Sequence, residues 1–78
     1  MKLAKHFGKV APGEENDIRT AFFVRLALSQ LYGDADEGAK KLLHAAVALS
    51  PDTARKAIEA LDCDEAWKEK MRDMVAGF

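Results

Sequence analysis

Two aspartates in a glycine-flanked segment are the first residues whose spacing could serve chemistry. Asp34 and Asp36 lie two positions apart in the segment Gly33-Asp34-Ala35-Asp36-Glu37-Gly38, the spacing of the ligands that open a calcium-binding loop. Such a loop also needs glycine at its sixth position and a bidentate glutamate at its twelfth, where this chain has Ala39 and Ala45. We therefore interpret the segment as a turn whose acidic residues begin the next helix, where the helix dipole favours negative charge.

Few residues could bind a transition metal or act as a nucleophile. His6 and His44 are the two histidines, and neither has a second ligand three or four residues away, as a zinc site on a helix would. Cys63, the single cysteine, lies between Asp62 and Asp64, whose negative charges disfavour the reactive thiolate. Because one cysteine cannot form a disulfide within the chain, a reducing cytoplasm is the expected location.

The sequence contains no motif for a serine nucleophile and none for a cofactor-binding loop. Ser29 and Ser50 lie neither in a nucleophile elbow nor in the Asp-Ser-Leu setting of an acyl carrier protein, and there is no glycine-rich phosphate loop. We therefore expect a non-enzymatic protein without a metal or a cofactor.

Size and charge limit the classes of partner. The 78 residues suffice for one domain with a thin core, and we expect a single helical domain over residues 1–78. Twelve Lys and Arg against thirteen Asp and Glu leave a net charge of −1, so no overall field attracts nucleic acid or an anionic membrane. No segment has the length of a membrane span. Recognition of a partner must therefore depend on a local surface.

The apolar spacing predicts an all-α fold, a compact orthogonal bundle of four to five short helices. Residues 1–13 are interpreted as a short basic helix or arm that ends at Pro12-Gly13. Lys2, Lys5 and Lys9 of this arm could contact phosphates, a membrane surface or an acidic protein, although three lysines are few for stable membrane association. The pattern favours the simpler alternative, in which apolar residues dock the arm on the bundle and the lysines stay solvated.

The strongest helical pattern runs from Ile18 to Leu31, with its start signal at Asn16 or Asp17 and its end near Gly33. Its predicted apolar stripe consists of Ile18, Ala21, Phe22, Val24, Leu28 and Leu31. Further apolar residues lie on other sides of this helix, so we expect more than one neighbour to bury it. A homodimer through this helix is a further hypothesis, because some of its apolar residues exceed what three small neighbours could cover. These residues are Phe22, Phe23, Leu26 and Ala27.

Three more helices complete the predicted bundle. The third carries apolar residues from Ala39 to Leu49, the fourth from Ala54 to Leu61, and the fifth from Trp67 to Val75. Asp62 as N-cap with Glu65 three residues later fits the capping-box spacing at the start of the fifth helix.

The junction of the third and fourth helices is the most informative local signal. Ser50 is a favoured N-cap whose hydroxyl can accept a backbone N–H, and Pro51 suits the first helical position. Asp52 lies in the first turn, where the helix dipole favours an anion. Two helices must therefore meet at a tight corner.

Residues 43–61 resemble the helix-turn-helix unit of DNA-binding proteins. The family's apolar packing positions are occupied by Leu43, Val47, Leu49, Ala54 and Ala57. Ser50 and Thr53 match the turn and the start of the second helix, whereas His44 and Ala48 depart from the family's preference for a small residue and for glycine. The resemblance implies a DNA-binding regulator whose second helix begins at Pro51 and enters the major groove.

The contact surface that this resemblance implies carries balanced charge. It consists of Asp52, Thr53, Arg55, Lys56 and Glu59. Because DNA affinity depends strongly on the neutralisation of phosphates, two positive and two negative charges favour another class of partner. We expect a protein-binding module, a regulator, adaptor or inhibitor that acts through this helix surface, with DNA binding as the alternative.

Overall fold

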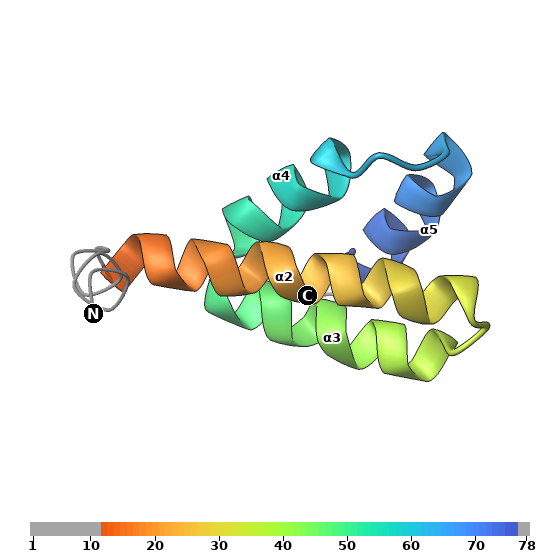
Figure 1. Cartoon of the computed structure of the whole chain (residues 1–78), viewed down its shortest axis with the longest axis horizontal. Coiled ribbons are helices and arrows are strands. Elements are labelled where there is room, and N and C mark those ends of the chain that lie inside the picture. Colours follow the sequence, from red (N-terminus) through yellow and green to blue (C-terminus); the bar gives the residue numbers. More distant parts are fainter. Residues whose placement is uncertain (1–11, 77–78) are drawn as a thin grey trace, which may run out of the picture.

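The computed structural model describes residues 12–76 and consists there of four α-helices joined by short connections (Figure 1). The helices are α2 (Pro12–Tyr32), α3 (Asp36–Leu49), α4 (Pro51–Ala60) and α5 (Glu65–Val75). The all-α bundle predicted from the sequence is confirmed. None of the helices in this part of the chain is both long and apolar enough to cross a bilayer. The predicted basic arm with Lys2, Lys5 and Lys9 lies outside the described residues.

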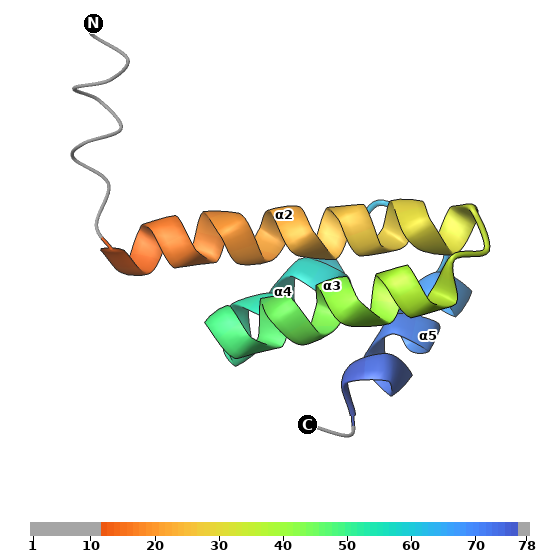
Figure 2. The same ribbon diagram turned by 90° about the horizontal axis from the view of Figure 1, so that it is seen from below.

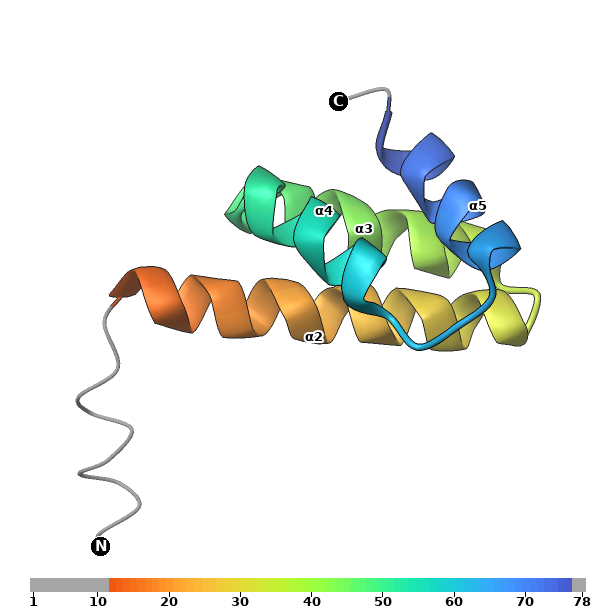
Figure 3. The same ribbon diagram turned by 90° about the horizontal axis from the view of Figure 1, so that it is seen from above.

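The long helix α2 and helix α3 form an antiparallel pair, and α4 and α5 pack beside it. In three views α3 returns along α2 in the opposite direction (Figures 1, 2 and 3). Helix α4 packs against both α2 and α3, and α5 packs against α3 and α4. Helix α3 is therefore in contact with all three other helices.

The core consists of small residues around a few large ones. Each helix contributes residues that are less than a tenth exposed: Val24, Ala27, Leu31, Ala39, Leu43, Ala46, Ala54, Ile58, Met71 and Val75. Because the distance between packed helices depends on the side chains at the contact, the alanines allow the backbones to approach closely.

Helix α2 begins earlier than its sequence predicts. The predicted start at Asn16 or Asp17 is wrong, because α2 already begins at Pro12. Proline is compatible with the first helical position, where its missing N–H has no partner within the helix. Gly13 costs about 1 kcal/mol relative to alanine, which a long packed helix tolerates.

The buried stripe of α2 also differs from the predicted one. It consists of Thr20, Val24, Ala27 and Leu31, and the Thr20 hydroxyl donates to the carbonyl of Asn16 at 2.7 Å. The predicted stripe included Ile18 and Phe22, which are 62% and 57% exposed. Both α3 and α4 cover α2, as expected, but they leave its outer side open.

The turn between α2 and α3 is closed by backbone hydrogen bonds. The N–H of Ala35 donates to the carbonyl of Gln30 at 2.8 Å, and that of Asp34 to Leu31 at 3.1 Å. This pattern is a Schellman motif with Asp34 (φ 61°) in the left-handed position that glycine usually occupies. Asp36 and Glu37 then lie in the first turn of α3, as predicted.

Ser50 alone separates α3 from α4, which confirms the predicted tight corner. Its N–H donates to the carbonyl of Ala46 at 3.0 Å, and its carbonyl accepts the N–H of Ala54 at 2.9 Å. Pro51 occupies the first turn of α4, as predicted. The Ser50 side chain, however, makes no capping hydrogen bond, so the expected contribution of its hydroxyl is not realised.

The N-cap of α5 lies two positions after the residue that the sequence predicted. Asp64, not Asp62, is the N-cap residue, and its carbonyl accepts the N–H of Trp67 at 3.0 Å. The capping box predicted for Asp62 and Glu65 is therefore wrong. Two aspartates of equal capping propensity lie two positions apart, and local sequence does not distinguish them.

Candidate functional site

Two of the contact residues predicted on α4, Thr53 and Glu59, are hydrogen-bonded to other helices, whereas Asp52, Arg55 and Lys56 face solvent. Asp52, Arg55, Lys56 and Glu59 are exposed, and Thr53 is half-buried. The Thr53 hydroxyl donates to the Asp17 carboxylate at 2.8 Å and so joins the start of α4 to α2. Thr53 is therefore held by the bundle.

Glu59 is hydrogen-bonded to residues of α5. Arg72 donates to its two carboxylate oxygens at 2.5 and 2.8 Å, and to Glu65 at 2.6 Å. Lys68 donates to the backbone carbonyl of Glu59 at 2.9 Å. The Arg72 hydrogen bonds lower the pKa of Glu59 and, with Glu65, raise the pKa of Arg72. This cluster connects α4 to α5 and leaves Glu59 little capacity for an external ligand.

The remaining α4 surface is small and electrically mixed. The Arg55 guanidinium lies 3.8 Å from the Asp52 carboxylate, a loose pair on one turn of the helix. Lys56 is exposed and has no ion-pair partner among the side chains that the structure describes. The helix therefore presents two cations, one of which has a neighbouring carboxylate.

A second surface, which the sequence did not predict as a contact site, lies on the outer side of α2. Ile18 and Phe22 lie one helical turn apart and have more than half of their surface exposed. At 100° per residue they point away from the stripe that contains Val24 and Ala27. We call these two residues the α2 ridge.

The homodimer hypothesis named four residues of this helix as uncovered. Phe22 is exposed as expected, whereas Ala27 is fully buried and Phe23 packs against the core. Leu26 is half-buried. The uncovered apolar surface thus centres on Phe22, together with Ile18, which that hypothesis did not include.

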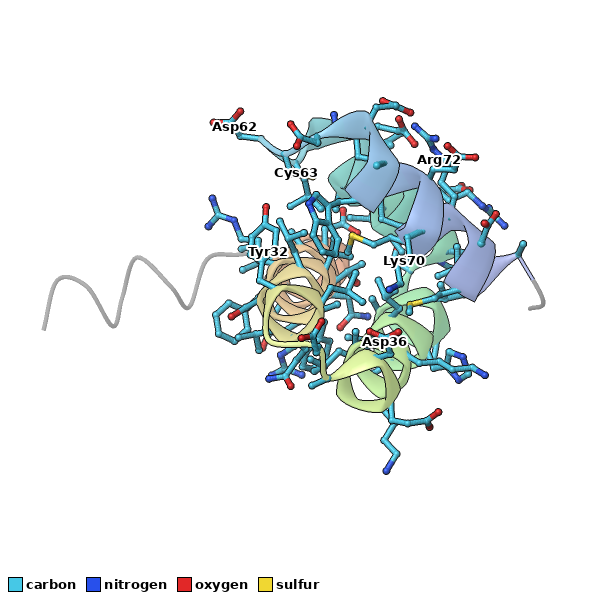
Figure 4. All side chains as sticks on the ribbon, turned by 90° about the vertical axis from the view of Figure 1, so that its right-hand side faces the viewer. Tyr32, Asp36, Asp62, Cys63, Lys70 and Arg72 are labelled. Atoms are coloured by element: carbon cyan, nitrogen blue, oxygen red, sulfur yellow. The ribbon has the colours of Figure 1, made fainter. Side chains whose placement is uncertain are left out.

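A hollow lies beside the α2 ridge, between α2 and the end of α4. Its volume is about 310 Å³, and its lining residues are Ala21, Arg25, Ala57, Ala60, Leu61 and Asp62. Arg25 and Asp62 are both exposed, and neither pairs with an opposite charge within residues 15–76. Asp62 points outward from the connection between α4 and α5 (Figure 4). The hollow is apolar at its walls and carries one charge of each sign at its rim.

A third surface, the groove between α3 and α5, is larger, with a volume of about 610 Å³, and all but one of its lining residues are charged or polar. Lys70 and Asp36 point toward each other at this groove, with Nζ 3.2 Å from Oδ2 (Figure 4). The Trp67 ring lies 5.0 Å from that of Tyr32 in an edge-to-face arrangement. These contacts hold the first turns of α5 against the α2–α3 turn, so the groove walls have a clear structural role.

The residues considered for metal binding or nucleophilic chemistry lie apart. His44 lines the groove between α3 and α5, whereas half-buried Cys63 lies in the connection after α4. Within the described part of the chain, no three His, Cys, Asp or Glu side chains come together to hold a metal ion. His6 lies outside the described residues.

Comparisons with protein-family models, with curated proteins and with solved structures found no match to this chain. The fold defines an all-α bundle, and its function has to be inferred from its own surfaces.

Proposed function

We propose that this protein is a non-enzymatic protein-binding module that contacts its partner through the outer face of α2. The observation that carries this proposal is the exposure of Ile18 and Phe22 on successive turns of the longest helix. Single exposed apolar residues are common on protein surfaces, but adjacent ones beside a hollow form a patch that a partner can cover. Burial of apolar surface contributes about 25 cal/mol per Å², so covering this patch favours association.

The proposed contact differs in place from the one that the sequence suggested. Thr53 and Glu59 of the predicted α4 surface are hydrogen-bonded to α2 and α5. A partner that bound at these positions would have to replace hydrogen bonds within the bundle. A partner that covered Ile18 and Phe22 would displace only water from their side chains. The α2 ridge is therefore the better-supported surface.

A module of this kind acts by occupying or joining other proteins, which is the action of a regulator, adaptor or inhibitor. The single free thiol, Cys63, is compatible with the reducing cytoplasm.

Affinity purification from native cells tests this function. The full-length chain carries a tag and is compared with the double variant Ile18→Ser/Phe22→Ser and with the control Lys41→Ser. Lys41 is exposed on α3, whereas the ridge lies on α2. We expect the wild type and the control to yield the same stoichiometric complex and the double variant to lose it. Equal recovery with all three chains would contradict the role of the ridge.

DNA binding remains the second candidate because Arg55 and Lys56 are exposed on the helix that follows the tight corner. Fluorescence anisotropy with a random duplex at low salt separates the two candidates. Binding that weakens steeply with salt and disappears in Arg55→Ala/Lys56→Ala would favour DNA. No binding at micromolar protein is the result expected for a protein-binding module.

A further inference from the structure

The hollow beside the α2 ridge has room for one large side chain. Three of its six lining residues, Ala21, Ala57 and Ala60, are alanines from two different helices. Their short side chains leave a depression of about 310 Å³ at a place where longer residues would have filled the space between α2 and α4. A leucine or phenylalanine from outside could enter it and contact apolar walls on both helices.

The two charges at the rim of the hollow determine which way round a charged occupant would bind. Arg25 belongs to α2, and Asp62 follows α4, so the two opposite charges come from different elements of the fold. Since neither charge is paired within residues 15–76, both are available to a ligand. An occupant that matches both must carry an acidic group near Arg25 and a basic group near Asp62.

The α2 ridge extends the apolar contact past the rim. Phe22 directly follows Ala21 of the hollow and precedes Arg25 by three residues, which places Phe22 and Arg25 on neighbouring parts of the helix surface. An occupant that covers both the hollow and the ridge must therefore present apolar side chains at more than one position. An amphipathic helix does this with residues three or four positions apart.

We propose that the partner seats an amphipathic helix on this surface. Its large apolar side chain enters the hollow, an acidic side chain pairs with Arg25, and a basic side chain pairs with Asp62. This inference rests on the proposed function and specifies the chemistry of the partner at the same surface.

A second copy of the chain fits this surface less well. On α2, Arg25 lies between the direction of Phe22 and that of Ala21 at 100° per residue. In a symmetric dimer, the ridge of each copy would enter the hollow of the other copy. Because Arg25 lies between ridge and hollow, the twofold axis of such a dimer would pass close to Arg25. The two Arg25 guanidinium groups would then approach each other, and like charges oppose such a contact.

A displayed library of three-turn amphipathic helices tests this inference. Each helix has a fixed leucine anchor, and the flanking positions vary between Glu and Lys. Selection uses the full-length wild type, Arg25→Glu, Asp62→Lys, the double charge exchange Arg25→Glu/Asp62→Lys, and the control Lys41→Glu on the exposed side of α3. Circular dichroism verifies that each variant is folded.

We expect the wild type and Lys41→Glu to enrich helices with Glu on one side of the anchor and Lys on the other. Each single exchange at the rim should weaken the best wild-type helix by about fivefold, the effect of losing one exposed charge pair. The double exchange should enrich helices with the two charges reversed. Recovery of the same helices from all five chains would overturn the inference.

Two further outcomes separate this inference from the proposed function. If light scattering shows a dimer that Phe22→Ser abolishes, the ridge binds protein, but its occupant is a second copy and the inference fails. If the wild type binds no helix of the library yet yields the ridge-dependent complex from cells, the inference fails and the proposed function stands. If neither helices nor a ridge-dependent complex are found, both fail.

Discussion

Arg72 on α5 donates two hydrogen bonds to the carboxylate of Glu59 on α4, at 2.5 and 2.8 Å. The two residues are 13 positions apart in the sequence and meet through the packing of the last two helices. This relationship changes the interpretation of α4, because a residue predicted to face a partner instead joins two helices. The binding surface that we propose therefore lies on α2, where the exposed side chains of Ile18 and Phe22 are not needed by the core.

The Glu59–Arg72 pair predicts a pH dependence of stability. Its hydrogen bonds lower the pKa of Glu59 in the folded protein, so the folded state binds the Glu59 proton less readily than the unfolded state does. The stabilisation is present at pH values above the ordinary glutamate range and is lost as the pH falls through the lowered pKa. We expect Glu59→Gln to reduce the melting temperature at pH 7 and to differ little from the wild type in strong acid. Thermal unfolding followed by circular dichroism at both pH values measures this, and a difference that grows toward acid pH would have the wrong sign.

Asp34 predicts a simple stabilising substitution. Its left-handed backbone (φ 61°) closes the Schellman motif, and glycine adopts that conformation without the steric cost of a Cβ. We expect Asp34→Gly to raise the free energy of unfolding by up to about 1 kcal/mol, because the relief of left-handed strain (about 1–2 kcal/mol) exceeds the greater backbone entropy that glycine loses on folding (about 0.5–1 kcal/mol). Asp34→Val should lower it, because a β-branched residue is disfavoured at positive φ. Urea unfolding of the three chains measures both changes, and a stabilising valine would contradict the turn geometry.

Two alanine substitutions, one on each side of α2, test which side of this helix is buried. Leu31 is fully buried, so Leu31→Ala should cost about 2–5 kcal/mol of unfolding free energy. Ile18 belongs to the exposed ridge, and Ile18→Ala should change it by less than about 0.5 kcal/mol. Equal losses in urea unfolding would show that Ile18 is part of the core.

The register of α2 also illustrates what the sequence could and could not predict. The existence of the helices followed from the 3.6-residue apolar period, and the tight corner followed from the local preferences of Ser50 and Pro51. On α2, however, apolar residues occur on several sides, and period alone could not show which side α3 and α4 would cover. Thr20, a polar residue whose hydroxyl bonds to the preceding turn, is buried, whereas Phe22 is not.

The candidate site depends even more on tertiary contacts. Arg25 and Asp62 lie 37 positions apart, and no local pattern indicates that they share one hollow. The same holds for Thr53 and Asp17, whose hydrogen bond joins two helices. A signal was nevertheless present for the hollow: alanines at positions 21, 57 and 60 leave space that their neighbours do not fill.

Site-specific photocrosslinking in the native cell tests the role of the α2 ridge most directly. The photoreactive analogue p-benzoyl-phenylalanine replaces Phe22, with the same analogue at Lys41 of α3 and at Lys56 of α4 as comparisons. We expect a protein adduct of defined mass from position 22 and none of that mass from positions 41 and 56. An adduct confined to position 56, or the absence of any adduct from position 22, would contradict a binding surface on the outer face of α2.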